Sequence, residues 1–153
     1  MLVFFLSLLF FSFDFFLKKI IELKFDFNTY YSLLGDIVRL RVVHNKGAAF
    51  GLFQGRVPFL IAVGFLFLVI FIFWVSKARH SLGQKLCLGM ILGGALSNLY
   101  DRIFLGYVID YIDLGWWPVF NLSDTFITLG CIFLILPQFI KDGREKVCRR
   151  KKT

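Results

Sequence analysis

The chain has 153 residues, of which 58% are hydrophobic and 21 are phenylalanine, and its mean hydropathy of +0.75 excludes an ordinary soluble domain. We therefore expect one membrane domain over residues 1–153. The net charge of +8 does not indicate a nucleic-acid partner, because seven of the 18 basic residues lie in the last 13 positions, after an apolar segment. A basic tail placed there is typical of contact with anionic lipid headgroups.

Four segments approach the length of about 20 apolar residues that a helix needs to cross a bilayer. They cover approximately residues 2–21, 58–75, 86–105 and 124–140. The sequence thus predicts a membrane all-α fold with four transmembrane helices. The third segment is rich in small residues, and Gly89 and Gly93 form a small-xxx-small pattern that allows another helix to approach closely.

Two charged residues interrupt the first segment. Asp14 and Lys18 are four positions apart, so they share one face of a helix. This spacing predicts a structural ion pair that makes insertion tolerable, rather than a catalytic pair. The segment lacks the basic start and the small-residue cleavage site of a cleaved signal peptide.

The connection between the first two segments has a pattern of its own. Apolar residues alternate roughly with Arg39 and Arg41, which predicts a small external β-element, a short strand or hairpin over residues 37–43 at the membrane surface. The Asn-Lys-Gly sequence that follows is typical of a turn. Asn45 also offers amide donors and an acceptor to a bound molecule.

The charges of the connections predict the orientation in the membrane. Residues 76–85 carry three Lys or Arg, whereas residues 103–140 carry no Lys, Arg or His. We expect the short connection and both termini to be cytoplasmic and the two larger loops to be external. Lys18, Lys19 and Lys24 oppose this orientation, but a lysine near a helix end can extend to the interface.

Polar residues gather where the third segment ends and the fourth begins. Asn98 and Arg102 are one helical turn apart, and Asn121 precedes Asp124 by three positions. Two interpretations stay open for this group: a helix-end network in which Arg102 extends toward solvent, or a binding site. Asp124 alone fits a helix cap as well as a catalytic role.

Three acids, Asp110, Asp113 and Asp124, have no basic residue near them in the sequence. An ionisable group at membrane depth is costly and usually marks a functional site. Asp110 alone would be interpreted as a solvated loop acid. If Asp110 and Asp124 meet, however, they cannot both stay ionised, and a shared proton allows the chemistry of an aspartic protease. The same three acids could instead hold Mg²⁺ in a membrane lipid transferase.

Two other functions stay open at this point. A serine hydrolase could use Ser97 or Ser123, with Lys46 as the only candidate base on an external loop. A transporter or scaffold without enzymatic activity would use the polar residues as a permeation path, although no internal repeat is visible. The spacing of the three cysteines fits neither a zinc site nor a disulfide framework, and we expect no metal or cofactor.

The motifs together resemble bacterial lipoprotein signal peptidase, the signal peptidase II family. The matching segments, in family order, are NKGAAF at 45–50, GGALSNLYDR at 93–102, GYVIDYI at 106–112 and FNLSD at 120–124. The Asp14 and Lys18 pair also fits. Three positions depart from the family pattern: Ser97 replaces a usual Gly, Tyr111 a common Phe and Ser123 a common Ala.

The resemblance implies an aspartic endopeptidase of the bacterial inner membrane, with four helices and an active site near the external face. Such an enzyme removes the signal peptide from prolipoproteins, cutting on the N-terminal side of a diacylglyceryl-modified Cys, and is inhibited by globomycin. By motif position, Asp110 and Asp124 form the catalytic dyad. The resemblance also assigns substrate-binding or dyad-holding roles to four polar residues: Asn45, Asn98, Arg102 and Asn121.

Overall fold

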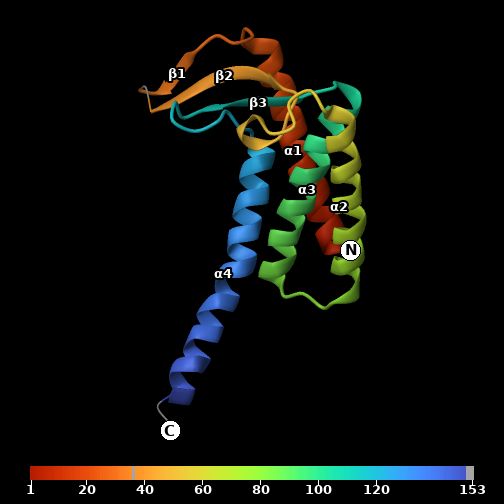
Figure 1. The fold of residues 1–153 in the computed structure, drawn as a ribbon, viewed down its shortest axis with the longest axis vertical. Coiled ribbons are helices and arrows are strands. Elements are labelled where there is room, and N and C mark those ends of the chain that lie inside the picture. Colours follow the sequence, from red (N-terminus) through yellow and green to blue (C-terminus); the bar gives the residue numbers. More distant parts are fainter. Residues whose placement is uncertain (36, 151–153) are drawn as a thin grey trace.

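A computed structural model describes residues 1–35 and 37–150, and the side chains among them except those of 49 and 138–150. Its elements are α1 (Leu2–Lys24), β1 (Tyr31–Leu34), β2 (Val38–Asn45), the 3-10 helix η1 (Ala49–Gly51), α2 (Val57–Lys77), α3 (Leu82–Phe104), β3 (Val108–Asp113) and α4 (Leu122–Arg150). The sheet lies at one end of the helices, and the N-terminus and the α2–α3 connection lie toward the other end (Figure 1). The predicted mainly helical fold with a small β-element is confirmed.

The sheet has three antiparallel strands in the order β1-β2-β3. The strand predicted over residues 37–43 is confirmed as β2, and β1 completes a hairpin with it. The third strand corrects the prediction, because the β-element is formed by the α1–α2 and the α3–α4 connections and not only by the one between the first two helices. The sequence of β3, Val-Ile-Asp-Tyr-Ile-Asp, consists largely of residue types that favour strands.

Glycines allow α3 to pack closely against α1 and α4. A Cβ atom added at Gly93 would lie 2.6 Å from the carbonyl oxygen of Ser7 on α1, and one added at Gly94 would lie 2.6 Å from that of Ser123 on α4. Gly89 also faces α1. The close helix approach predicted from Gly89 and Gly93 is therefore confirmed.

The bundle has charged groups inside and apolar groups outside. Asp14 and Lys18 are fully buried between helices, whereas large side chains of α2 such as Phe65 and Phe73 are exposed. Among the described helices, α2 is the one that is both long and apolar enough by composition to cross a membrane. A buried charge pair within an apolar exterior is the reverse of the arrangement that water favours.

The helix limits lie within four residues of the predicted ones, except at the end of α4. α3 begins earlier than predicted because Ser81 caps it: the Ser81 hydroxyl accepts a hydrogen bond from the Gln84 amide, and the Gln84 side chain accepts one from the Ser81 amide. α4 continues through Pro137 to Arg150. The predicted lipid contact of the basic tail depends on side chains from 141 onward, which lie outside the described ones.

Candidate active site

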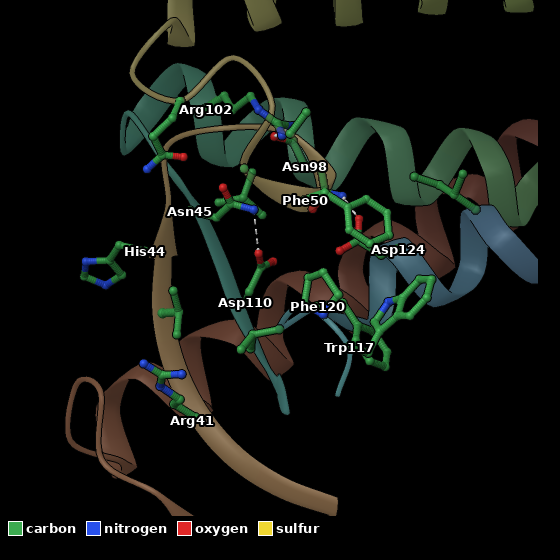
Figure 2. Close-up of a pocket in the computed structure, with 18 of the residues that line it drawn as sticks. Arg41, His44, Asn45, Phe50, Asn98, Arg102, Asp110, Trp117, Phe120 and Asp124 are labelled. Carbon is green, nitrogen blue, oxygen red and sulfur yellow. Dashed lines mark hydrogen bonds between the residues drawn. The ribbon is translucent and has the colours of Figure 1, made fainter. Parts of the chain in front are cut away.

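Folding brings Asp110 on β3 and Asp124 in the first turn of α4 to the same pocket. A cavity of about 480 Å³ is lined by both acids and by Asn45, Asn98 and Arg102 (Figure 2). Asp110 is only 3% exposed, so the interpretation of this residue as a solvated loop acid is wrong. The reason is β3, which places Asp110 opposite β2 within the sheet.

Two asparagine side chains donate hydrogen bonds to Asp110. Asn45 Nδ2 lies 2.8 Å from Asp110 Oδ2 (Figure 2), and Asn121 Nδ2 lies 2.8 Å from Asp110 Oδ1. The register of the sheet explains the first contact, since Val43 of β2 pairs with Asp110 and Asn45 lies two residues further along. Asn45 also accepts a hydrogen bond from the Gly47 amide at 2.9 Å, so it forms the predicted turn as well.

The surroundings of Asp110 favour its protonated form. Burial, and then the negative charge of Asp124, raise the pKa of Asp110 to about 7. The hydrogen bonds from Asn45 and Asn121 and the positive charge of Lys18 oppose this rise. Near neutral pH, both the protonated and the ionised form of Asp110 are therefore populated, as general acid–base catalysis requires.

Asp124 is held by the start of its own helix. Asn121 immediately precedes α4 and caps it, because its Oδ1 accepts a hydrogen bond of 2.9 Å from the Asp124 amide. In return, Asp124 Oδ2 accepts one of 3.3 Å from the Asn121 amide. Of the two interpretations left open for Asp124, the helix cap is not what the structure shows: Asn121 is the cap, and Asp124, the third residue of α4, returns the contact.

Asn98 completes a chain of amide contacts between the two acids. Its Nδ2 donates to Asp124 Oδ1 at 2.8 Å, and its Oδ1 accepts from Asn121 Nδ2 at 3.0 Å. Asn121 in turn reaches Asp110. The two carboxylates are thus connected through two side chains, and no cation bridges them directly among the described contacts.

Arg102 connects α3 to the loop that follows β2. Its Nη2 donates to the carbonyl oxygen of Gly47 at 3.1 Å, and its Nη1 to that of Asn98 at 3.3 Å. The guanidinium is therefore engaged inside the protein rather than extended toward solvent. Its Nε is buried without a hydrogen-bond partner among the described residues, which leaves one donor at a residue that lines the cavity.

Aromatic rings close one end of the pocket, beside Asp124 (Figure 2). The rings of Phe50 and Trp117 meet edge to face with centroids 5.2 Å apart, and Phe120 lies near them. They come from two loops that are far apart in the sequence. Sequence reasoning missed Phe50 and Phe120, since single phenylalanines carry little information in a chain with 21 of them.

The remaining candidate residues lie outside the cavity. The ion pair predicted for the first helix is present, with Lys18 Nζ 2.9 Å from Asp14 Oδ2. Asp113 is bound by Arg39 Nη2 at 3.3 Å and is absent from the cavity lining. Among the described residues, no group of three His, Cys, Asp or Glu side chains could hold a metal ion.

Ser97 and Ser123 do not have the environment of catalytic nucleophiles. Both are at most 1% exposed, and both hydroxyls donate hydrogen bonds of 2.6 Å to Asp14. A nucleophilic serine must instead face the substrate and a base. The structure therefore does not favour the serine hydrolase.

Comparisons with known proteins agree on one family. The sequence model described as "Signal peptidase (SPase) II" matches residues 6–140. A protein named "Lipoprotein signal peptidase" from Syntrophomonas wolfei is 45% identical over 117 residues, which are 75% of this chain and 77% of the relative. Another protein of that name, from Caldicellulosiruptor bescii, is 39% identical over 129 residues, which are 84% of this chain and 85% of the relative.

The fold is also similar to that of a solved protein titled as a bacterial membrane enzyme. The two chains superpose with a TM-score of 0.84 and are 25% identical, and the match covers 94% of this chain and 90% of the other.

Proposed function

The chain belongs to the signal peptidase II family, and we infer from this that it is a protease that removes the signal peptide from prolipoproteins. We propose that Asp110 and Asp124 are its catalytic dyad. One observation carries this proposal: the two acids line a single cavity and are connected through the amides of Asn121 and Asn98. Such a pair can share one proton.

In the proposed reaction the two carboxyl groups have different roles. Asp110, with a pKa of about 7, is the protonated member, and Asp124 in the first turn of α4 is the ionised one, stabilised by the helix dipole. Asp124 takes a proton from water, which attacks the scissile carbonyl carbon while Asp110 protonates the carbonyl oxygen. As the C–N bond breaks, Asp124 gives its proton to the leaving amine and the oxygen returns one to Asp110. No acyl-enzyme forms.

In this proposal, the four polar residues around the dyad position the two carboxyl groups and the neighbouring loop. Asn98 and Asn121 orient the carboxylates, and Asn45 supports Asp110 from β2. Arg102 lines the cavity and fixes the loop at Gly47, which forms part of the site's surroundings. These roles need no metal or cofactor.

We propose that the substrate is a prolipoprotein whose Cys carries a diacylglyceryl group, cut on the N-terminal side of that Cys. We also propose that all four helices cross the inner membrane, with both termini cytoplasmic and the cavity near the external face. The apolar exterior of the bundle supports the crossing. The sheet and the basic α2–α3 connection lie toward opposite ends of the bundle, which supports the orientation (Figure 1).

Incubation of the purified protein with a diacylglyceryl-modified precursor and with its unlipidated form tests the function. We expect cleavage of the modified precursor only, a product that begins with the lipidated Cys, inhibition by globomycin and no effect of a chelator. Equal cleavage of both forms would reject the lipid requirement. Inactivation by the chelator would favour the Mg²⁺-dependent alternative.

A further inference from the structure

A second polar cluster lies beside the dyad but outside the cavity. It consists of Asp14, Lys18, Ser97, Asp101 and Ser123, none of which is more than 2% exposed or lines the cavity. The substrate therefore cannot touch these residues. Burying the charged side chains of Asp14, Lys18 and Asp101 costs free energy. We therefore ask what this cluster contributes to the neighbouring dyad.

Lys18 is at the centre of this cluster and uses all its donors. An ammonium group has three protons, and three acceptors lie at short distances: Asp101 Oδ2 at 2.8 Å, Asp14 Oδ2 at 2.9 Å and Asn98 Oδ1 at 3.0 Å. The first two are carboxylates of opposite charge, and a fourth acceptor, Ser97 Oγ, lies farther away at 3.4 Å. The third belongs to the residue that donates a hydrogen bond to Asp124.

The contact with Lys18 determines which way the Asn98 amide points. Asn98 Oδ1 accepts hydrogen bonds from Lys18 Nζ and from Asn121 Nδ2, both at 3.0 Å. A rotated amide would place its NH₂ group against these two donors and its oxygen against the Asp124 carboxylate. Both contacts would be repulsive, so Lys18, together with Asn121 and Asp124, fixes the orientation in which Asn98 Nδ2 donates to Asp124.

Two serines hold the partner of Lys18. Asp14 Oδ2 accepts hydrogen bonds from the hydroxyls of Ser97 and Ser123, both at 2.6 Å, and Asp14 Oδ1 accepts one of 3.1 Å from the Ser123 amide. Ser97 immediately precedes Asn98 on α3, and Ser123 immediately precedes Asp124 on α4. One carboxylate on α1 thus joins both helices next to their site residues.

We propose that Lys18 is a positioning residue that fixes the Asn98 amide against Asp124, and that Ser97 and Ser123 keep Lys18 in place by binding Asp14. This inference rests on the proposed function of the dyad. It assigns the serine hydroxyls a role in the rate of the chemical step, without contact with the substrate.

The double variant Ser97→Ala/Ser123→Ala tests the proposal, because it removes two hydroxyls and leaves every charge. We expect kcat to fall about 10-fold while KM changes less than about 2-fold, as lost alignment of a reacting group predicts. Ser7→Ala is the matched control, since the Ser7 hydroxyl is also buried on α1 but donates to the Phe4 carbonyl outside the cluster. We expect the control to keep the parent kcat and KM.

A kcat of the folded double variant within 2-fold of the parent would overturn the proposal. If Asp110→Asn is inactive in the same assay, that failure concerns the positioning role alone and leaves the dyad intact. Activity in Asp110→Asn would instead reject the proposed function itself. The two failures are therefore distinguishable.

The pH profile of Lys18→Met gives a second readout that a merely structural role would not change. The positive charge of Lys18 holds the pKa of Asp110 down, against the burial and the charge of Asp124 that raise it. Its removal raises that pKa, so the loss of kcat/KM at high pH should move to higher pH. Lys18→Arg keeps the charge and should restore the parent profile. An unshifted profile in folded Lys18→Met would contradict the role of this charge.

Discussion

Asn121, which immediately precedes α4, donates a hydrogen bond of 2.8 Å to Asp110 on β3. The same side chain caps α4, the helix that carries Asp124. The position of one acid therefore depends on how the helix of the other begins. This coupling connects the stability of α4 with the geometry of the proposed dyad.

Asn121→Ala should affect both stability and activity. The variant loses a helix cap and buried hydrogen bonds, which lowers the free energy of unfolding by about 2 kcal/mol. We expect kcat to fall about 100-fold, because both acids lose a partner that orients them. Thermal unfolding and cleavage of a lipidated precursor measure the two effects.

Ser81→Ala is the control for the cap alone. Ser81 caps α3 by the same reciprocal arrangement, with Gln84 as its partner. The free energy of unfolding of the Ser81→Ala variant should fall by about 1 kcal/mol, and its kcat should equal that of the parent. Equal activity of the Asn121 and Ser81 variants would contradict the role of Asn121 in the site.

The pH dependence of cleavage should report the proton on Asp110. Since the pKa of Asp110 is raised to about 7 and its protonated form is the active one, kcat/KM should decline above about pH 7. The hydrogen bond from Asn45 favours the ionised form. Asn45→Ala therefore raises the pKa, and the decline should move to higher pH.

Asp113→Asn provides the comparison for this experiment. Asp113 lies on the same strand but is bound by Arg39 outside the cavity. Its replacement should leave the pH profile where it is in the parent. A profile of Asn45→Ala that moves to lower pH, or that matches the Asp113 variant, would show that the Asn45 contact does not control this proton.

Gly94→Ala should destabilise the bundle. The added Cβ would lie 2.6 Å from the carbonyl oxygen of Ser123 and 2.9 Å from the Ile127 side chain, so α3 and α4 must separate. Overpacking of this kind costs about 1–3 kcal/mol. Gly83→Ala lies on the same helix with nothing within 4 Å of the added atom, and it should be as stable as the parent. Thermal unfolding of both variants is the measurement, and equal stabilities would contradict the close packing.

The helices were predictable because long apolar segments with polar ends have few other structures available. The alternation around Arg39 and Arg41 likewise predicted β2. In contrast, β3 was missed because its acids, Asp110 and Asp113, gave it the polarity of a loop. Its β-branched and aromatic residues were a local signal for a strand, but burial on both faces depends on contacts with β2 that no local pattern contains.

The site was also predictable only in part, because contacts between elements that are distant in the sequence are not contained in any local pattern. The lack of nearby basic residues singled out Asp110 and Asp124, and the family motifs added Asn45, Asn98, Arg102 and Asn121. The contact of Lys18 with Asn98 joins residues 80 positions apart. Spacing within one helix predicted the pairing of Lys18 with Asp14, but it could not predict how α1, α3 and α4 meet.

The rate of cleavage by Asp110→Asn and by Asp124→Asn tests the central claim most directly. Each change removes a titratable proton but keeps the shape of the side chain, so both proteins should insert and fold as the parent does. We predict that each loses about 100-fold or more of kcat on a diacylglyceryl-modified precursor at neutral pH. A folded variant of either kind that cleaves at the parent rate would contradict the account.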